Sequence, residues 1–421
     1  MDPRATGTAD ADRRAGRDRG RVTTTPPRRV DVVVVGAGQA GLSAAYHLRR
    51  AGLRAGDGSG VASEGAASGD GVPARVVDDA TSGTGARAGA GAGTGTGTFV
   101  LLDDAPEPGG AWQHRWPSLT MQHTHAVHEL PGMPLEGFDP QEPASAAVGR
   151  YFAAYEQRFA LPVVRPVRVG AVRDAGQGLL SVETDRGRWL TRALVNATGT
   201  WQRPFWPSYP GQSGFAGQQL HTHDFRSASD FLGRHVVVVG GGTSAVQLLL
   251  QIADVTTTTW VTRTPPTFLP RAFDEEWGRE VVARVDERTR AGLPPLSVVG
   301  VTGLPLTEEY QRGIDRGVLV PLPMFARIVP DGVRWDPRDV PPAPEHLRAD
   351  VLLWATGFRA GLDHLAPLRL RGHGGGIVMD GTQVVADPRV QLVGYGPSAS
   401  TIGANRAGRE AVRNVRRLLA L

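Results

Sequence analysis

Residues 32–41 read VVVVGAGQAG, and the chain continues as LSAAYHL over residues 42–48. This pattern is typical of a buried parallel strand that runs through a glycine turn into a helix, and GxGxxG in that setting indicates a dinucleotide site. The first glycine permits the tight turn, the second lets the backbone approach a pyrophosphate, and the third lets helix and strand lie close together. The alternative is a glycine turn in an unrelated α/β protein. The residues assigned to this site are Gly36, Gly38, Gln39, Ala40 and Gly41.

The same motif needs an acid at the end of the next strand, usually about 20 residues on, to hold the adenosine ribose. No strand is predicted to end at that distance. Asp78 follows the segment RVV, and Asp103 follows the segment FVLL. We choose Asp103, because GGAW follows it at residues 109–112 and because a Gly/Ala-rich stretch, residues 53–98, would have moved the strand downstream. The alternative is that Asp103 caps an unrelated turn.

A second stretch, residues 236–245, reads VVVVGGGTSA and repeats the strand–turn–helix pattern, with alanine in the third glycine position. The next strand, residues 258–262, ends in Arg263 rather than in an acid. An arginine at that place can pair with the 2′-phosphate of NADPH, which favours NADPH over NADH. The alternative is a solvated loop charge. The residues assigned to this second site are Gly240, Gly242, Thr243, Ser244 and Arg263.

Composition narrows the classes of function. All 46 basic residues are arginines, they are dispersed, and the formal net charge is only +4, which does not favour nucleic-acid binding. No apolar run approaches the roughly 18 residues of a membrane helix, and no secretory signal is recognisable, so we expect a cytoplasmic protein without membrane association. The chain has no cysteine, which excludes disulfides, cysteine metal sites and thiol nucleophiles. The histidine spacing indicates no metal site either.

Several motifs together resemble the flavin-containing monooxygenases, relatives of the Baeyer–Villiger monooxygenases among flavoproteins with two dinucleotide-binding domains. Residues 215–225, FAGQQLHTHDF, match FxGxxxHxxxF just before the second glycine motif. GGAW resembles the GGxW segment near the flavin, and ATG occurs in the expected order at residues 197–199 and 355–357. The resemblance runs from about Val30 to the end, except for the stretch 53–98.

This resemblance implies FAD at the first glycine motif and NADPH at the second. NADPH would reduce FAD, and the reduced flavin would react with O2 and oxygenate a small organic or heteroatom-containing substrate, while the protein supplies position, dryness and electrostatics. The helix that starts near Thr401 would point its positive end at the flavin. Tyr395 stands where many relatives carry an acid. The further cofactor contacts that the resemblance implies are Gly110, Trp112, Gly357, Gly396 and Asn405.

Three residues are candidates for catalytic contacts. Gln122 and His123 lie near the place where the family carries an asparagine close to the flavin, and either could donate a hydrogen bond there or be a polar loop residue. His221 belongs to the fingerprint of residues 215–225. We expect His221 to tie the connection between the domains together rather than to transfer protons.

The predicted fold is α/β, with two Rossmann-like, three-layer dinucleotide-binding domains. We expect the FAD-binding domain in two parts, residues 30–200 and 350–421, with the NADPH-binding domain, residues 201–349, inserted between them. Residues 1–29 and 53–98 are polar or Gly/Ala-rich without hydrophobic period, so we expect a disordered N-terminal arm and a flexible insertion.

The leading hypothesis is therefore a FAD- and NADPH-dependent monooxygenase. One alternative is an NADPH-dependent flavin reductase or oxidase that passes electrons to a non-thiol acceptor without oxygenation. Another is a non-catalytic NADP-binding sensor with a degenerate flavin site, against which Asp103 and the following GGAW argue. The expected partners are O2 and a small-molecule substrate, and a homodimer is one oligomeric state to consider.

Overall fold

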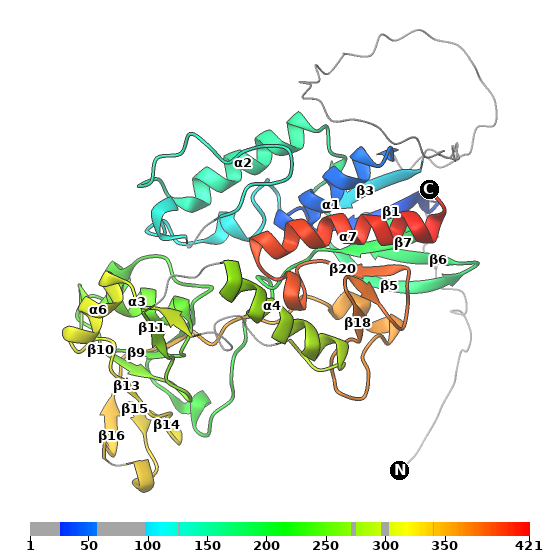
Figure 1. The fold of residues 1–421 in the computed structure, drawn as a ribbon. Coiled ribbons are helices and arrows are strands. Elements are labelled where there is room, and N and C mark those ends of the chain that lie inside the picture. Colours follow the sequence, from blue (N-terminus) through cyan, green and yellow to red (C-terminus); the bar gives the residue numbers. More distant parts are fainter. Residues whose placement is uncertain (1–25, 57–96, 125–126, 271–274, 296–302, 340) are drawn as a thin grey trace, which may run out of the picture.

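The computed structural model describes residues 26–56, 97–124, 127–270, 275–295, 303–339 and 341–421 (Figure 1). Most of the expected N-terminal arm and of the expected insertion, residues 1–25 and 57–96, lies outside these ranges. The described strands begin inside the expected bounds of both segments, at Arg28 and at Arg54. Within the described ranges, no helix combines the length and the apolar character that crossing a bilayer requires.

The larger of the two main sheets has ten strands in the described part of the chain. Its parallel centre is β1 (Arg28–Val35), which lies between β3 (Thr98–Leu102) and β7 (Gly187–Asn196), and β20 (Val390–Leu392) follows beyond β7. Because these four strands are parallel, their carboxyl ends meet at one edge. The remaining strands of this sheet are β2 (Arg54–Ala55), β4 (Val163–Val164), β5 (Val169–Gly176), β6 (Leu179–Thr184), β18 (Met379–Asp380) and β19 (Gln383–Val384).

Both faces of β1 are buried, which explains its unbroken run of valines. Val32 and Val34 pack with the helices α1 (Gln39–Arg50), α2 (Ala144–Arg158) and α7 (Thr401–Leu419). Val33 and Val35 face the other way, towards residues of β5, β6 and the 3₁₀ helix η6 (Asp363–Leu368). Figure 1 shows α1 and α7 side by side on one face of the sheet.

The second sheet is fully parallel and has the order β13-β10-β9-β17-β8. Its strands are β8 (Gln218–His221), β9 (Val236–Val239), β10 (Thr258–Val261), β13 (Pro321–Leu322) and β17 (Val351–Trp354). The helices α3 (Thr243–Ala253) and α6 (Glu308–Asp315) share its core. Smaller elements around it are β11 (Phe268–Leu269), β12 (Leu304–Pro305), β14 (Arg327–Val329), β15 (Gly332–Arg334), β16 (His346–Arg348), η3 (Gln212–Gly214), η4 (Ala228–Phe231) and η5 (Pro337–Asp339). The helix α4 (Glu275–Arg290) lies instead against β18 of the larger sheet and against the 3₁₀ helix η7 (Gly396–Ser398).

The expected domain boundary at residue 350 does not match this topology. The strand β17 follows that boundary, yet it pairs with β9 from Val351–Val236 to Trp354–Val239 and also with β8. Its four buried apolar residues are satisfied only inside the second sheet, so the chain leaves that sheet after Trp354. The two segments that connect the sheets then run side by side, because the Phe205 N–H donates to the Gly357 carbonyl over 2.9 Å.

Candidate functional site

The first glycine turn follows β1 at the carboxyl edge of the larger sheet, and two of its glycines are required by the protein itself. Gly36 has φ +97, and a Cβ there would lie 2.6 Å from the carbonyl oxygen of Ala197. A Cβ on Gly41 would lie 1.8 Å from the carbonyl oxygen of Gly36. No side chain fits at either position, so these glycines serve the contact of turn, helix and sheet.

Gly38 is different. It has φ −81, which any residue adopts, and the nearest heavy atom to a Cβ there would be the Cα of Gly110 at 3.9 Å. Its lack of a side chain is therefore not explained by packing within the protein. A ligand that approaches the backbone at this point does explain it.

The start of α1 also fits an anionic ligand. No side chain caps this helix, and no acidic residue lies in its first turn, so its first N–H groups are free to bind phosphate oxygens. The Gln39 side chain donates to the His128 carbonyl over 3.1 Å and to Asn405 Oδ1 over 3.2 Å, while its Oε1 is buried without a hydrogen-bond partner. A buried acceptor without a donor is costly, and a bound hydroxyl or amide would satisfy it.

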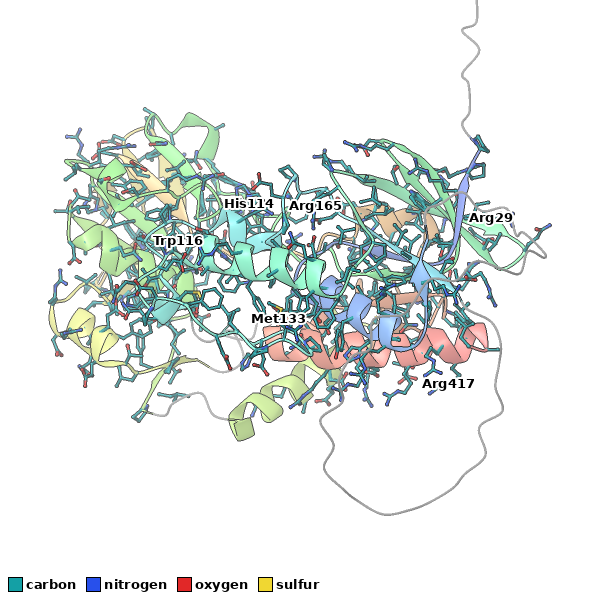
Figure 2. All side chains as sticks on the ribbon, turned by 90° about the horizontal axis from the view of Figure 1, so that it is seen from above. Arg29, His114, Trp116, Met133, Arg165 and Arg417 are labelled. Atoms are coloured by element: carbon teal, nitrogen blue, oxygen red, sulfur yellow. The ribbon has the colours of Figure 1, made fainter. Side chains whose placement is uncertain are left out.

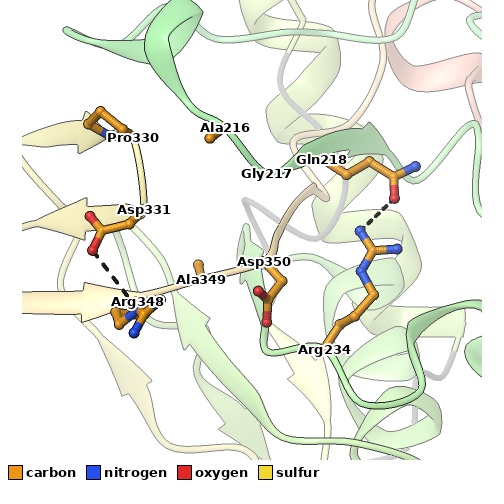
Figure 3. A pocket seen from close by; sticks show the side chains of 9 residues that line it. All are labelled: Ala216, Gly217, Gln218, Arg234, Pro330, Asp331, Arg348, Ala349 and Asp350. Atoms are coloured by element: carbon orange, nitrogen blue, oxygen red, sulfur yellow. Dashed lines mark hydrogen bonds and ion pairs between the residues drawn. The ribbon is translucent and has the colours of Figure 1, made fainter.

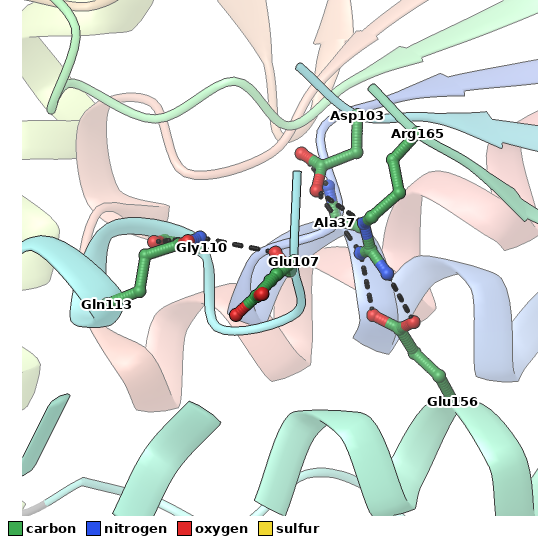
Figure 4. A network of polar contacts seen from close by, with 7 residues as sticks. All are labelled: Ala37, Asp103, Glu107, Gly110, Gln113, Glu156 and Arg165. Atoms are coloured by element: carbon green, nitrogen blue, oxygen red, sulfur yellow. Dashed lines mark hydrogen bonds and ion pairs between the residues drawn. The ribbon is translucent and has the colours of Figure 1, made fainter. Parts of the chain in front are cut away.

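Asp103 lies beside this turn, at the end of β3 (Figure 4). The Ala37 N–H donates to its Oδ1 over 3.2 Å, and Arg165 Nε donates to its Oδ2 over 3.2 Å. Burial raises the pKa of Asp103, and these two donors oppose the rise. A carboxylate has about four acceptor positions, so this one keeps capacity for the hydroxyls of a ribose. Asp78, the other candidate, lies outside the described residues.

The clamp behind Asp103 was not predicted from the sequence. Arg165 also binds Glu156 of α2 through two hydrogen bonds, of 2.6 and 2.8 Å. Arg165 is thereby held between two carboxylates that stand 53 residues apart in the chain, and it fixes the orientation of the expected ribose acid.

Three of the remaining residues expected near FAD, Gly110, Asn405 and Gly396, lie around the same edge, whereas Gly357 follows β17 of the second sheet. Gly110 begins the 3₁₀ helix η1 (Gly110–His114), and a Cβ on it would lie 2.8 Å from the Cα of Gly38. Asn405 of α7 donates to the Glu129 carbonyl over 2.7 Å as well as accepting from Gln39. Gly396 starts the 3₁₀ helix η7 (Gly396–Ser398), directly before α7. The first turn of α7 is partly capped, since the Gly403 N–H donates to Ser400 Oγ over 3.0 Å.

The second glycine turn, after β9, also combines a glycine that the packing of the protein requires with one that it does not require. A Cβ on Gly240 would lie 2.2 Å from the carbonyl oxygen of Ala355, whereas a Cβ on Gly242 would meet nothing within 4 Å. The helix α3 starts at Thr243 and Ser244 with no side-chain cap. Arg263 follows β10, is exposed, and has no hydrogen bond or ion pair with any described residue. Its guanidinium is therefore available to a phosphate.

His221 joins the two connecting segments. It is fully buried, its Nδ1 accepts from the His223 N–H over 3.0 Å, and its Nε2 lies 3.1 Å from the Gly357 carbonyl oxygen. Because Nδ1 is an acceptor, the proton is on Nε2 and is donated to Gly357. Burial lowers the pKa of His221 to about 4. Backbone groups occupy both nitrogens, which is a positioning arrangement and leaves neither nitrogen for proton transfer.

Gln122 and His123 lie in the 3₁₀ helix η2 (Met121–His123) and are both exposed. The Gln122 amide donates to Gln141 Oε1 over 3.3 Å, and His123 Nδ1 lies 2.8 Å from Thr120 Oγ1. The His123 carbonyl accepts from Gln247 of α3, so η2 is attached to the second domain.

Sequence reasoning missed an aromatic cluster at the junction of the two sheets, which we call the junction cluster: His114, Arg115, Trp201 and Phe358. The Trp201 ring stacks on Phe358 at 5.1 Å and on His114 at 5.9 Å. The Arg115 guanidinium carbon lies 4.7 Å from the centre of the Trp201 ring. Figure 2 places His114 between the two halves of the molecule.

A cavity of about 570 Å³ lies elsewhere, among residues that include Gln218, Arg234, Asp331 and Asp350 (Figure 3). It is at the amino ends of β8 and β17, the edge opposite the second glycine turn. Ligands of open parallel sheets bind at the carboxyl ends of the strands, so this cavity is separate from the expected cofactor sites.

One sheet is parallel at its centre and the other is fully parallel. A glycine turn follows a parallel strand at the carboxyl edge of each, which defines an α/β protein with two dinucleotide-binding sheets. A model of the family "Pyridine nucleotide-disulphide oxidoreductase" matches residues 117–276. The structure of a flavin-containing monooxygenase from Stenotrophomonas maltophilia is 34% identical with a TM-score of 0.70, over 93% of this chain and 99% of that chain. The chain belongs to the flavin-containing monooxygenase family and is an oxidoreductase. The family uses FAD and NAD(P)H.

Two curated relatives are more distant. The "Uncharacterized oxidoreductase CzcO" of Bacillus velezensis is 25% identical over 240 residues, which are 57% of this chain and 56% of that protein. The "Probable indole-3-pyruvate monooxygenase YUCCA4" of Arabidopsis thaliana is 32% identical over 155 residues, 36% of this chain and 38% of that protein. The chain thus spans about half the length of the CzcO relative, and less of the plant protein.

Proposed function

We propose that the chain is a FAD- and NADPH-dependent monooxygenase that oxygenates a small organic or heteroatom-containing molecule. The observation that carries the proposal is the pair of glycines that the protein's own packing does not require. Gly38 and Gly242 each precede an uncapped helix, and each leaves the backbone open where a pyrophosphate would lie. One such turn fits many nucleotide-binding proteins, whereas two of them, in a member of this family, fit an electron donor and a flavin.

In this proposal each residue has a limited task. The turn at Gly36–Gly41 binds the FAD pyrophosphate, Asp103 accepts from the ribose hydroxyls, and Arg165 keeps the Asp103 carboxylate in place. Bound FAD supplies the chemistry, since it takes up a hydride from NADPH and reacts with O2. The turn at Gly240–Ser244 binds the NADPH pyrophosphate.

Other residues hold the two sites together and select the nucleotide. Arg263 binds the 2′-phosphate, and His221 keeps the two connecting segments in register. Gln122 and His123 are proposed to contact the flavin or the substrate. Because Arg263 has no partner in the described protein, its pairing with phosphate displaces no existing contact.

The test uses the purified chain loaded with FAD. NADPH is added without oxygen and flavin bleaching is followed, and air is then admitted with a thioether, a tertiary amine, a ketone or a 2-oxo acid present. The 2-oxo acid is included because a relative is named as an indole-3-pyruvate monooxygenase. Oxygenated product formed in step with NADPH consumption supports the proposal. Hydrogen peroxide equal to the NADPH consumed, with no product from any compound, would identify an oxidase, and failure to bind FAD would identify a sensor.

A further inference from the structure

Arg115 has an unusual environment for a partly buried cation. Its guanidinium lies over two indoles, with Cζ 4.7 Å from the centre of the Trp201 ring and 5.8 Å from that of Trp112. Among the described residues it has no acidic partner and no side-chain hydrogen bond. Arg165, by contrast, is held by two carboxylates. Removing part of a cation's water without supplying a counter-charge is unfavourable, and an anion bound beside Arg115 would offset this cost.

The charge state of Arg115 agrees with this picture. Burial lowers its pKa to about 10, and no neighbouring charge contributes to the shift in either direction. Arg115 therefore remains a cation at neutral pH. The Arg115 side chain is partly exposed, and none of its three nitrogens is fully buried. A ligand in solution can therefore reach these nitrogens.

The position of Arg115 lies between the two expected cofactor sites. Trp112 is two residues from Gly110, which touches Gly38 of the first glycine turn. Trp201 follows the first ATG segment at the carboxyl edge of the larger sheet, and it stacks on Phe358, which follows the second ATG segment. The reactive rings of two bound nucleotides have to meet between these edges, and a substrate has to reach the same place.

The other anions already have partners in the proposed function. Each pyrophosphate has a glycine turn and a helix N-terminus, and the 2′-phosphate has Arg263. Arg115 is left for the substrate. The two indoles lie near its guanidinium carbon, at 4.7 and 5.8 Å. The edge of the planar guanidinium carries the N–H groups, and that edge matches a carboxylate through two parallel hydrogen bonds.

We propose that Arg115 binds the carboxylate of the substrate, and that the chain accordingly acts on small organic acids in preference to their neutral or cationic counterparts. This proposal rests on the proposed function, because the argument places the substrate between two bound nucleotides. The flanking indoles favour acids with a flat or apolar body, which can lie against Trp201 and Trp112.

The experiment measures binding rather than turnover. Benzoate and phenylacetate are titrated calorimetrically into the FAD-loaded protein, and benzamide and phenylacetamide serve as neutral counterparts of the same shape. We expect the wild-type protein to bind at least one acid about tenfold or more tightly than its amide. Arg115→Gln should weaken binding of that acid by about 10- to 100-fold and leave the amide unchanged, because a charged hydrogen-bonded pair is lost. Arg115→Lys keeps the charge but cannot form the two parallel hydrogen bonds, so its affinity for the acid should lie between those of the wild type and Arg115→Gln.

Arg413→Gln, which removes an exposed arginine of α7, is the matched control and should bind as the wild type does. Equal affinity for acid and amide, no binding of either acid, or an Arg115→Gln protein that binds the acid as before would overturn the proposal. FAD content and anaerobic bleaching by NADPH are recorded on the same preparations. A wild-type protein that binds no FAD, or whose FAD is not bleached by NADPH, contradicts the proposed function. Normal bleaching without selective binding of the acid contradicts only the role of Arg115.

Discussion

Replacement of Gly38 by alanine separates a glycine that serves a ligand from one that serves the fold, and Gly41→Ala is its counterpart. Both residues belong to the same turn. The added methyl group would lie 3.9 Å from the nearest heavy atom at Gly38, and 1.8 Å from a backbone carbonyl oxygen at Gly41. Gly38→Ala should therefore weaken FAD binding and leave the stability of the fold nearly unchanged, whereas Gly41→Ala should destabilise the fold itself.

For stability, the effects at Gly38 nearly cancel. Alanine is a poorer residue than glycine before the first turn of a helix, by about 0.5 to 1 kcal/mol. It also restricts the unfolded chain, which stabilises the folded state by about 0.4 to 1 kcal/mol at an unstrained position. Gly38→Ala should thus unfold within about 1 kcal/mol of the wild type. Gly41→Ala forces a backbone shift and should lose about 3 kcal/mol or more.

For FAD affinity, the methyl group on Gly38 occupies the space through which a phosphate would approach. Loss of one charge-assisted hydrogen bond costs about 1.5 to 3 kcal/mol, which corresponds to a dissociation constant for FAD that is about 10- to 150-fold larger. Thermal unfolding of the apoprotein measures the first quantity, and titration of flavin fluorescence measures the second. A Gly38→Ala protein that binds FAD as tightly as the wild type, or one that fails to fold, would refute the reasoning.

Three further predictions concern the nucleotide, the pH dependence of stability and the catalytic candidates. Arg263→Ala should raise KM for NADPH by about 10- to 100-fold and change KM for NADH by less than about twofold in stopped-flow reduction; equal changes would exclude the phosphate contact. Burial lowers the pKa of His221 and of His364 from 6.5 to about 4. Between pH 4 and pH 6.5 the unfolded chain therefore binds more protons than the folded chain does. The urea midpoint should be highest above about pH 6.5 and fall as the pH is lowered to 4, and a flat profile over that window would contradict the buried neutral state. Gln122→Ala and His123→Ala should lower the ratio of product to NADPH consumed, and an unchanged ratio would remove both from the site.

The local patterns of the sequence predicted an α/β protein with two dinucleotide-binding sheets, which the structure confirms, whereas the cofactor residues that they indicated stay predictions. Strand, glycine turn and helix follow one another within residues 28–50 at the first motif and within residues 236–253 at the second, and the valine runs mark strands buried on both faces. Asp103 was chosen through the GGAW that follows it, and His221 through its place in residues 215–225, and their roles stay predictions. The strands, turns and helices themselves could be predicted because turn geometry and hydrophobic period act between neighbours in the chain.

Tertiary structure decided the rest. The strand β17 belongs to the second sheet because it pairs with β9, more than a hundred residues earlier. Arg165 and Glu156 support Asp103, and Arg115 lies between Trp112 and Trp201, only after distant segments pack together. The difference between Gly38 and Gly41 is likewise invisible in the pattern GxGxxG, since it depends on which atoms surround each Cα. Sequence spacing specifies what a turn is able to bind, whereas partners and free space are properties of packing between remote parts of the chain.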